Sequence, residues 1–78
     1  MSLFEQVRET IETALRVPPG KITERTRAED IAAWDSIGQV NLVMAIEQTF
    51  NIYLDVEDFP KMSSVPAILA YLKEQGLK

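Results

Sequence analysis

The hydroxyl best placed for chemistry in this chain belongs to Ser36, which follows Asp35 directly and opens an apolar-rich, proline-free stretch that runs to Phe50. A polar pair before such a stretch is typical of a helix start, where Asp or Ser accepts hydrogen bonds from the first unpaired backbone N–H groups. This end of a helix also carries a partial positive charge that suits a phosphate. Ser36 is therefore either a helix cap or an attachment point for a phosphate-bearing group.

The helix expected after Ser36 is apolar on two sides when its residues are placed at about 100° each. One side forms an ordinary core stripe of Leu42, Val43, Ile46 and Phe50. The other side, on a face largely across from the first, carries Ile37, Val40 and Met44. Because so short a chain cannot easily bury a helix all round, we expect this second stripe to be exposed and to bind a partner.

Acidic residues are concentrated around the same helix. The chain has a formal net charge of −4. The segment 34–62 contains five acidic residues and a single basic residue, Lys61; the acidic residues are Asp35, Glu47, Asp55, Glu57 and Asp58. Such a surface is a poor partner for nucleic acid, whose binding depends on Lys and Arg. A basic protein partner fits better, with Glu47 and the three later acidic residues supplying complementary charge. A charge that merely keeps the protein in solution is the alternative.

The residues needed for common enzyme chemistry are missing. The chain has no histidine and no cysteine, so the usual nucleophile–base pairs cannot be assembled. Neither a Gly-rich phosphate loop nor a diagnostic metal-ligand spacing is present, so we expect no catalytic residues and no metal. Glu57 and Asp58 are interpreted as the wet side of a short helix, and Trp34 as a cover for the core where a loop meets the helix.

Length and composition predict one globular domain over residues 1–78. Hydrophobic residues make up 46% and charged residues 26% of the chain, which are ordinary globular values. No apolar run approaches the length of about 18 residues that a membrane span requires, and no leader-like segment precedes the first predicted helix. We therefore expect a soluble, cytoplasmic monomer without membrane insertion.

The elements that position Ser36 are predicted to be helices. We expect helices at 2–16, 36–50 and 65–75, a short helix at 56–59 that stops near Pro60, and one helical turn at 28–31. Ser2 and Glu5 have capping-box spacing, Asn51 suits a left-handed C-terminal cap, and Ser63 or Ser64 caps the last helix. In the first helix, Phe4, Val7, Ile11, Ala14 and Leu15 form the core stripe, with Glu9, Thr10, Glu12 and Thr13 on the wet side. The fold class is all-α: a small four-helix bundle of three main helices and one short helix, with a long loop at 21–33 anchored by Ile22 and Ile31.

Asp35-Ser36-Ile37 resembles the Asp-Ser-Leu signature of acyl carrier proteins, and the resemblance runs ungapped over nearly the whole chain. It implies that a phosphopantetheinyl transferase joins a covalent 4′-phosphopantetheine from coenzyme A to Ser36, with Asp35 helping to position the junction. The thiol of that arm would hold acyl groups as thioesters and present them to acyl-transferring or acyl-modifying enzymes.

Departures from the family pattern favour a specialised pathway over main fatty acid synthesis. Gly38 and Asn41 stand where carriers for fatty acid synthesis often have acidic residues, Trp34 replaces a small residue, and Phe59 lies where a small residue is common. A rival interpretation is a small helical adaptor. In that case Ser36 would be only a cap, and the face of Ile37, Val40 and Met44 would enter a partner's groove.

Overall fold

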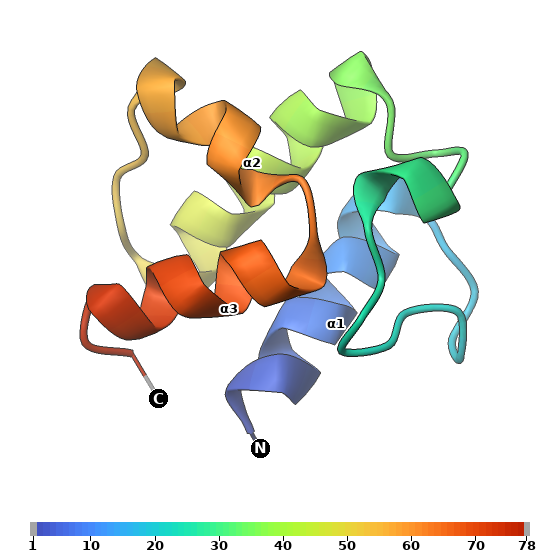
Figure 1. Cartoon of the computed structure of the whole chain (residues 1–78), viewed down its shortest axis with the longest axis horizontal. Helices are drawn as coiled ribbons and strands as arrows, with labels where there is room; N and C mark the ends of the chain where they lie inside the picture. The colour runs from blue at the N-terminus through green and yellow to red at the C-terminus, as the bar shows by residue number, and fades with distance from the viewer. Residues whose placement is uncertain (1, 78) are drawn as a thin grey trace.

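The computed structural model describes residues 2–77, which fold as a small helical bundle (Figure 1). Its elements are α1 (Leu3–Leu15), the 3₁₀ turn η1 (Ala28–Asp30), α2 (Ser36–Phe50), the 3₁₀ segment η2 (Val56–Met62) and α3 (Val65–Glu74). No strand occurs within residues 2–77, where Arg27 and Ser64 pair only through an isolated bridge. The predicted all-α bundle of three main helices and one short helix is confirmed.

Both ends of α1 follow from residues within one turn of them. The Ser2 hydroxyl oxygen accepts a hydrogen bond from Glu5 N at 3.1 Å, and Ser2 N donates to Glu5 Oε1 at 3.1 Å, so the predicted capping box is present. At the other end Arg16 adopts a left-handed conformation, with φ 56° and ψ 42°, and its N–H donates to Glu12 O. The helix therefore ends at Leu15, one residue before the end predicted from the sequence.

The core is built from one face of each helix together with residues of the connecting loops. Its fully buried side chains include Val7, Ile11, Leu42, Val43, Ile46, Met62, Val65, Ile68 and Leu72. The prediction that Thr10 faces water is wrong: it is only 7% exposed, and its hydroxyl donates to the Gln6 carbonyl oxygen at 2.7 Å. α1 packs mainly against α2, so its covered face extends beyond the apolar stripe to include this residue.

The long connection between α1 and α2 is held against the start of α3. Ile22 is buried and Ile31 half-buried, as expected of its anchors. Two backbone hydrogen bonds that the sequence did not indicate complete the attachment: Val65 N donates to Thr26 O, and Ala28 N donates to Ser63 O, both at 2.8 Å. The loop that leads into Ser36 is thereby fixed to a helix almost forty positions later in the chain.

The short third helix differs from its prediction in type and length. It is a 3₁₀ segment that continues through Pro60 to Met62 rather than ending near the proline. Met62 is fully buried, so its packing holds the end of the segment although Pro60 has no N–H to contribute. Among residues 2–77, no helix combines the length and the apolar character that crossing a membrane requires.

Candidate functional site

The first turn of α2 separates the roles of Asp35 and Ser36, which the sequence left open. Asp35 is the N-cap, and its Oδ1 accepts a hydrogen bond from Gly38 N at 2.8 Å. Ser36 is the first helical residue and is exposed. Its side chain makes no hydrogen bond with any part of residues 2–77. The helix is capped without the serine, whose hydroxyl faces solvent.

Trp34 is only 5% exposed and covers the core beside Ser36, as the sequence predicted. Its indole Nε1 donates to Gln39 Oε1 at 2.5 Å, and Gln39 Nε2 donates to the carbonyl oxygens of Phe59 at 2.6 Å and Met62 at 3.2 Å. One glutamine side chain thus ties the loop before α2 to η2. Sequence reasoning missed Gln39, because its partners in η2 lie 20 and 23 positions away.

Gly38 lets the start of α2 approach the preceding loop. A Cβ built at this position would collide with the backbone carbonyl oxygen of Ala33 and would lie 3.1 Å from Leu15 Cδ2. The carbonyl cannot rotate away as a side chain could. The absence of an acidic side chain at position 38 therefore has a packing reason, because no side chain fits there without moving the backbone.

Replacing Gly38 by alanine is expected to lower the free energy of unfolding by about 1–2 kcal/mol, as overpacking against the Ala33 carbonyl outweighs the gain in helix propensity. Urea denaturation monitored by circular dichroism measures the change. Asn41→Ala, at an exposed position of the same helix, is the control and should leave stability nearly unchanged. A Gly38→Ala variant more stable than the wild type would contradict the packing argument.

The second apolar stripe of α2 is exposed, as its angular position predicted. Ile37 is 74% exposed, Val40 45% and Met44 52%. Leu42, Val43 and Ile46 on the other face are fully buried, and Phe50 is half-buried. Sequence reasoning missed two further exposed apolar residues, Tyr53 and Val56, each 79% exposed. Tyr53 lies in the connection between α2 and η2, and Val56 is the first residue of η2, so neither belongs to a helix long enough for its periodicity to reveal an exposed stripe.

The four acidic residues expected to meet a partner are not equally available. Glu47 Oε2 accepts a hydrogen bond from Leu54 N at 2.8 Å, and Asp58 Oδ2 accepts from Asp55 N and from the Tyr71 hydroxyl, both at 3.3 Å. Partial burial and the Asp58 charge raise the pKa of the Tyr71 phenol. Asp55 and Glu57 are exposed, so these two present the most accessible negative charge.

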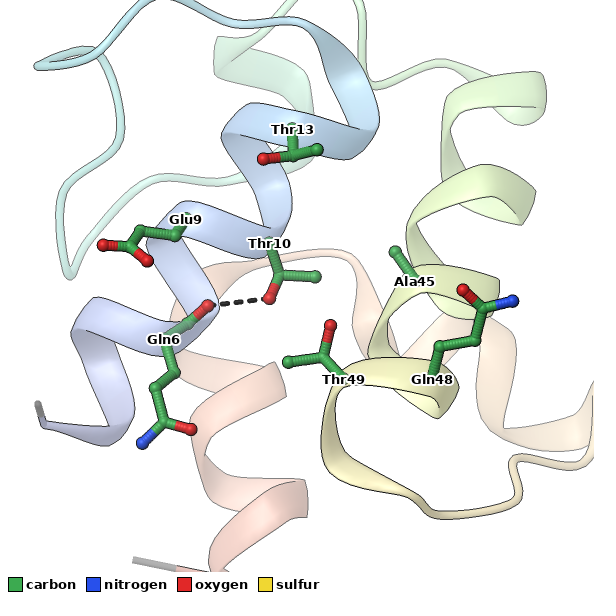
Figure 2. Close-up of a pocket in the computed structure, with 7 residues that line it drawn as sticks. All are labelled: Gln6, Glu9, Thr10, Thr13, Ala45, Gln48 and Thr49. Atoms are coloured by element: carbon green, nitrogen blue, oxygen red, sulfur yellow. Dashed lines mark hydrogen bonds between the residues drawn. The ribbon is translucent and has the colours of Figure 1, made fainter.

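Two open grooves lie between α1 and α2. The first, of about 450 Å³, is lined by Gln6, Glu9, Thr10, Thr13, Ala45, Gln48 and Thr49 (Figure 2). The second, of about 570 Å³, is lined by Thr13, Ala14, Leu15, Arg16, Ala33, Asp35, Ile37, Gly38 and Asn41. Both chain neighbours of Ser36 line the second groove, so the serine lies at its rim. Within residues 2–77, no three His, Cys, Asp or Glu side chains are grouped to hold a metal ion.

Comparison with known proteins gives the chain its family. Residues 5–72 match the family model described as the phosphopantetheine attachment site. The acyl carrier protein of Akkermansia muciniphila is 40% identical over 96% of this chain and 95% of its own length. Those of Wolinella succinogenes and Bdellovibrio bacteriovorus are each 34% identical, over 94% and 97% of this chain and 96% and 97% of their own lengths. The chain therefore belongs to the family of acyl carrier proteins, which are not enzymes themselves and carry a covalently attached 4′-phosphopantetheine.

Proposed function

We propose that Ser36 is the residue to which 4′-phosphopantetheine is attached. The observation that carries the proposal is that Asp35 caps α2 through Gly38 N, which leaves the Ser36 hydroxyl exposed and without a structural role. A transferase can reach this oxygen, and its modification breaks no hydrogen bond within residues 2–77. Asp35 acts here as a positioning residue, because its cap fixes the first turn from which Ser36 projects.

The arm supplies a chemical group that this chain lacks, a thiol that can hold an acyl group as a thioester. The chain's own residues anchor the arm and present it. A tethered acyl group meets a docked enzyme at an effective concentration set by the length of the arm. A chain that has no histidine or cysteine can act in this way, because the arm supplies the reactive group and the chain only holds it.

The proposed docking surface for partner enzymes consists of Ile37, Val40 and Met44, with negative charge from Glu47, Asp55, Glu57 and Asp58. The exposure of all three apolar residues supports this assignment. Asp55 and Glu57 would face basic side chains of a partner directly. Glu47 and Asp58 would add to the negative potential, since their carboxylates already accept hydrogen bonds within the chain. Charge of this kind raises the rate of encounter more than the affinity.

Attachment is tested by intact mass before and after incubation with coenzyme A, Mg²⁺ and a broad-specificity phosphopantetheinyl transferase. We expect a gain of one phosphopantetheine, located by peptide mapping on the peptide that contains Ser36. A folded protein that gains no mass, or gains it on another residue, would overturn the proposal.

For the pathway, we propose specialised acyl transfer, in polyketide, peptide, lipid or surface-polysaccharide modification, rather than main fatty acid synthesis. α2 carries a single charged residue, Glu47, and the carboxylate of this residue accepts a hydrogen bond from Leu54 N. The helix that follows Ser36 therefore presents an apolar and only weakly charged face, which suits different partners from those of a strongly acidic helix. We further propose that residues 1–78 act as one domain, as a monomer, in the cytoplasm, where coenzyme A is available.

Phe59 is expected to limit the internal sequestration of long acyl chains. Its side chain is half-buried and packs against the core. We expect the melting temperature of the acylated protein to change by less than about 2 °C between short and long acyl chains, since little apolar area is newly buried. Phe59→Ala should create space and let long chains raise the melting temperature. Marked stabilisation of the wild type by long chains would contradict this expectation.

A further inference from the structure

The groove beside Ser36 contains an arginine, Arg16, whose backbone caps α1 but whose side chain has no partner within residues 2–77. Arg16 lines this groove together with Asp35 and Ile37, the two neighbours of Ser36. It is exposed and forms no ion pair with any side chain of residues 2–77. Asp35, the one acidic residue of the lining, accepts a hydrogen bond from Gly38 N instead. The guanidinium is therefore available to an anionic ligand.

The backbone at Arg16 is in an unfavourable conformation for this residue type. Its φ of 56° and ψ of 42° place it in the left-handed region, which costs a residue with a Cβ roughly 1–2 kcal/mol. Glycine and asparagine are the usual residues at such a helix end. Strain of this kind is concentrated at functional sites. Here the residue with the strained backbone, Arg16, is also the cation that lines the groove.

The rest of the groove offers hydrogen bonds. Thr13 on α1 and Asn41 on α2 are both exposed and line it. Thr13 also lines the neighbouring groove, so the two grooves adjoin along the α1–α2 contact. Figure 2 shows this neighbouring first groove between α1 and α2, where Thr10 and Thr49 add two further threonine side chains. An elongated ligand rich in amides would find polar partners along this path.

We propose that the α1–α2 groove binds the 4′-phosphopantetheine arm when no enzyme is docked, with the Arg16 guanidinium contacting the phosphodiester and Thr13 and Asn41 hydrogen-bonding to the amides of the arm. The inference rests on the proposed attachment at Ser36. A guanidinium binds phosphate oxygens in a planar, two-pronged geometry. Val40 and Met44 do not line this groove, so the arm in this position leaves most of the proposed docking stripe uncovered.

The test compares backbone amide NMR spectra of the apo and holo forms of the full chain, after intact mass has verified loading. In the wild type, loading should shift the Thr13, Arg16 and Asn41 signals in addition to those next to Ser36. Asparagine tolerates the left-handed region, so Arg16→Asn removes the guanidinium from a backbone that can stay as it is. In this variant the shifts at Thr13 and Asn41 should fall by at least about half because the phosphate contact is lost. Arg25→Asn, at an exposed arginine that does not line the groove, should keep them.

The outcomes separate this inference from the proposed attachment. A mass gain at Ser36 with shifts confined to residues 34–38, or with identical shifts in Arg16→Asn and the wild type, would overturn the groove assignment and leave the carrier function intact. Absence of a mass gain on the folded wild type would overturn the attachment at Ser36 and the groove assignment together. Groove shifts in the wild type that Arg16→Asn weakens and Arg25→Asn retains would establish the site.

Discussion

Replacing Ser36 by alanine is expected to abolish the gain of one phosphopantetheine while changing the free energy of unfolding by less than about 0.5 kcal/mol. Loading should fall to zero rather than decrease in part, because alanine has no oxygen to form the phosphodiester. Stability should hardly change, since Asp35 caps α2 and the Ser36 side chain is exposed without a hydrogen-bond partner in residues 2–77. Intact mass and urea denaturation on the same sample measure both quantities.

Two control variants make the Ser36→Ala result specific. Ser63→Ala removes another exposed hydroxyl and should load fully. Asp35→Ala should cost about 1 kcal/mol of stability, the usual value of an N-cap, and should slow loading without preventing it. The stabilisation by the N-cap therefore comes from Asp35, although the sequence alone left open whether Asp35 or Ser36 provides it. A full mass gain on Ser36→Ala, or a stability loss as large as that of Asp35→Ala, would contradict this division of roles.

Replacing Gln39 by methionine is expected to lower the free energy of unfolding by about 2–3 kcal/mol, since it removes hydrogen bonds from partly buried polar groups. Methionine has a similar length but can neither accept a bond from Trp34 Nε1 nor donate to the carbonyls of Phe59 and Met62. In a chain this short the loss is a large part of total stability. Urea denaturation measures it, and Trp34 fluorescence should shift to the red as η2 loosens and water reaches the indole.

Gln48→Met is the matched control, because Gln48 is an exposed glutamine on the same helix. Its stability should remain within about 0.5 kcal/mol of the wild type. Gln39→Glu gives a second comparison. Its carboxylate can still accept from Trp34 Nε1, but it cannot donate to the Phe59 and Met62 carbonyls and places negative charge beside them. Equal stabilities for Gln39→Met and Gln48→Met would mean that the glutamine does not tie η2 to α2.

Membership of the acyl carrier family also settles the choice that composition left open between a carrier and a small adaptor. The two interpretations predicted the same exposed stripe on α2, because any helix that meets a partner's groove needs one. They differed only in the use of the Ser36 hydroxyl. Carrier function was expected from the resemblance of Asp35-Ser36-Ile37 and the rest of the chain to acyl carrier proteins, because exposure of the stripe by itself could not have distinguished the two.

The sequence by itself determined the three main helices and, to within one residue, their ends. Helix formation and capping depend on residues within about one turn of each other. Accordingly, the Ser2–Glu5 capping box, the end of α2 at Asn51 and the exposed face of Ile37 and Val40 were all predicted and are all present. Ser36 was identified as the candidate site for the same reason, since its neighbours in the chain define the helix start.

The tertiary structure alone decided which residues meet across the fold. The Trp34–Gln39–Phe59 hydrogen bonds, the contact of Gly38 with the Ala33 carbonyl and the burial of Thr10 arise from the packing of separate segments. No local pattern indicates such partners, because hydrophobic periodicity specifies which face of a helix is covered but not what covers it. The position of Arg16 on the lining of the groove beside Ser36 also depends on tertiary structure. It results from the left-handed backbone of Arg16 at the end of α1 and from the packing of α2 against α1.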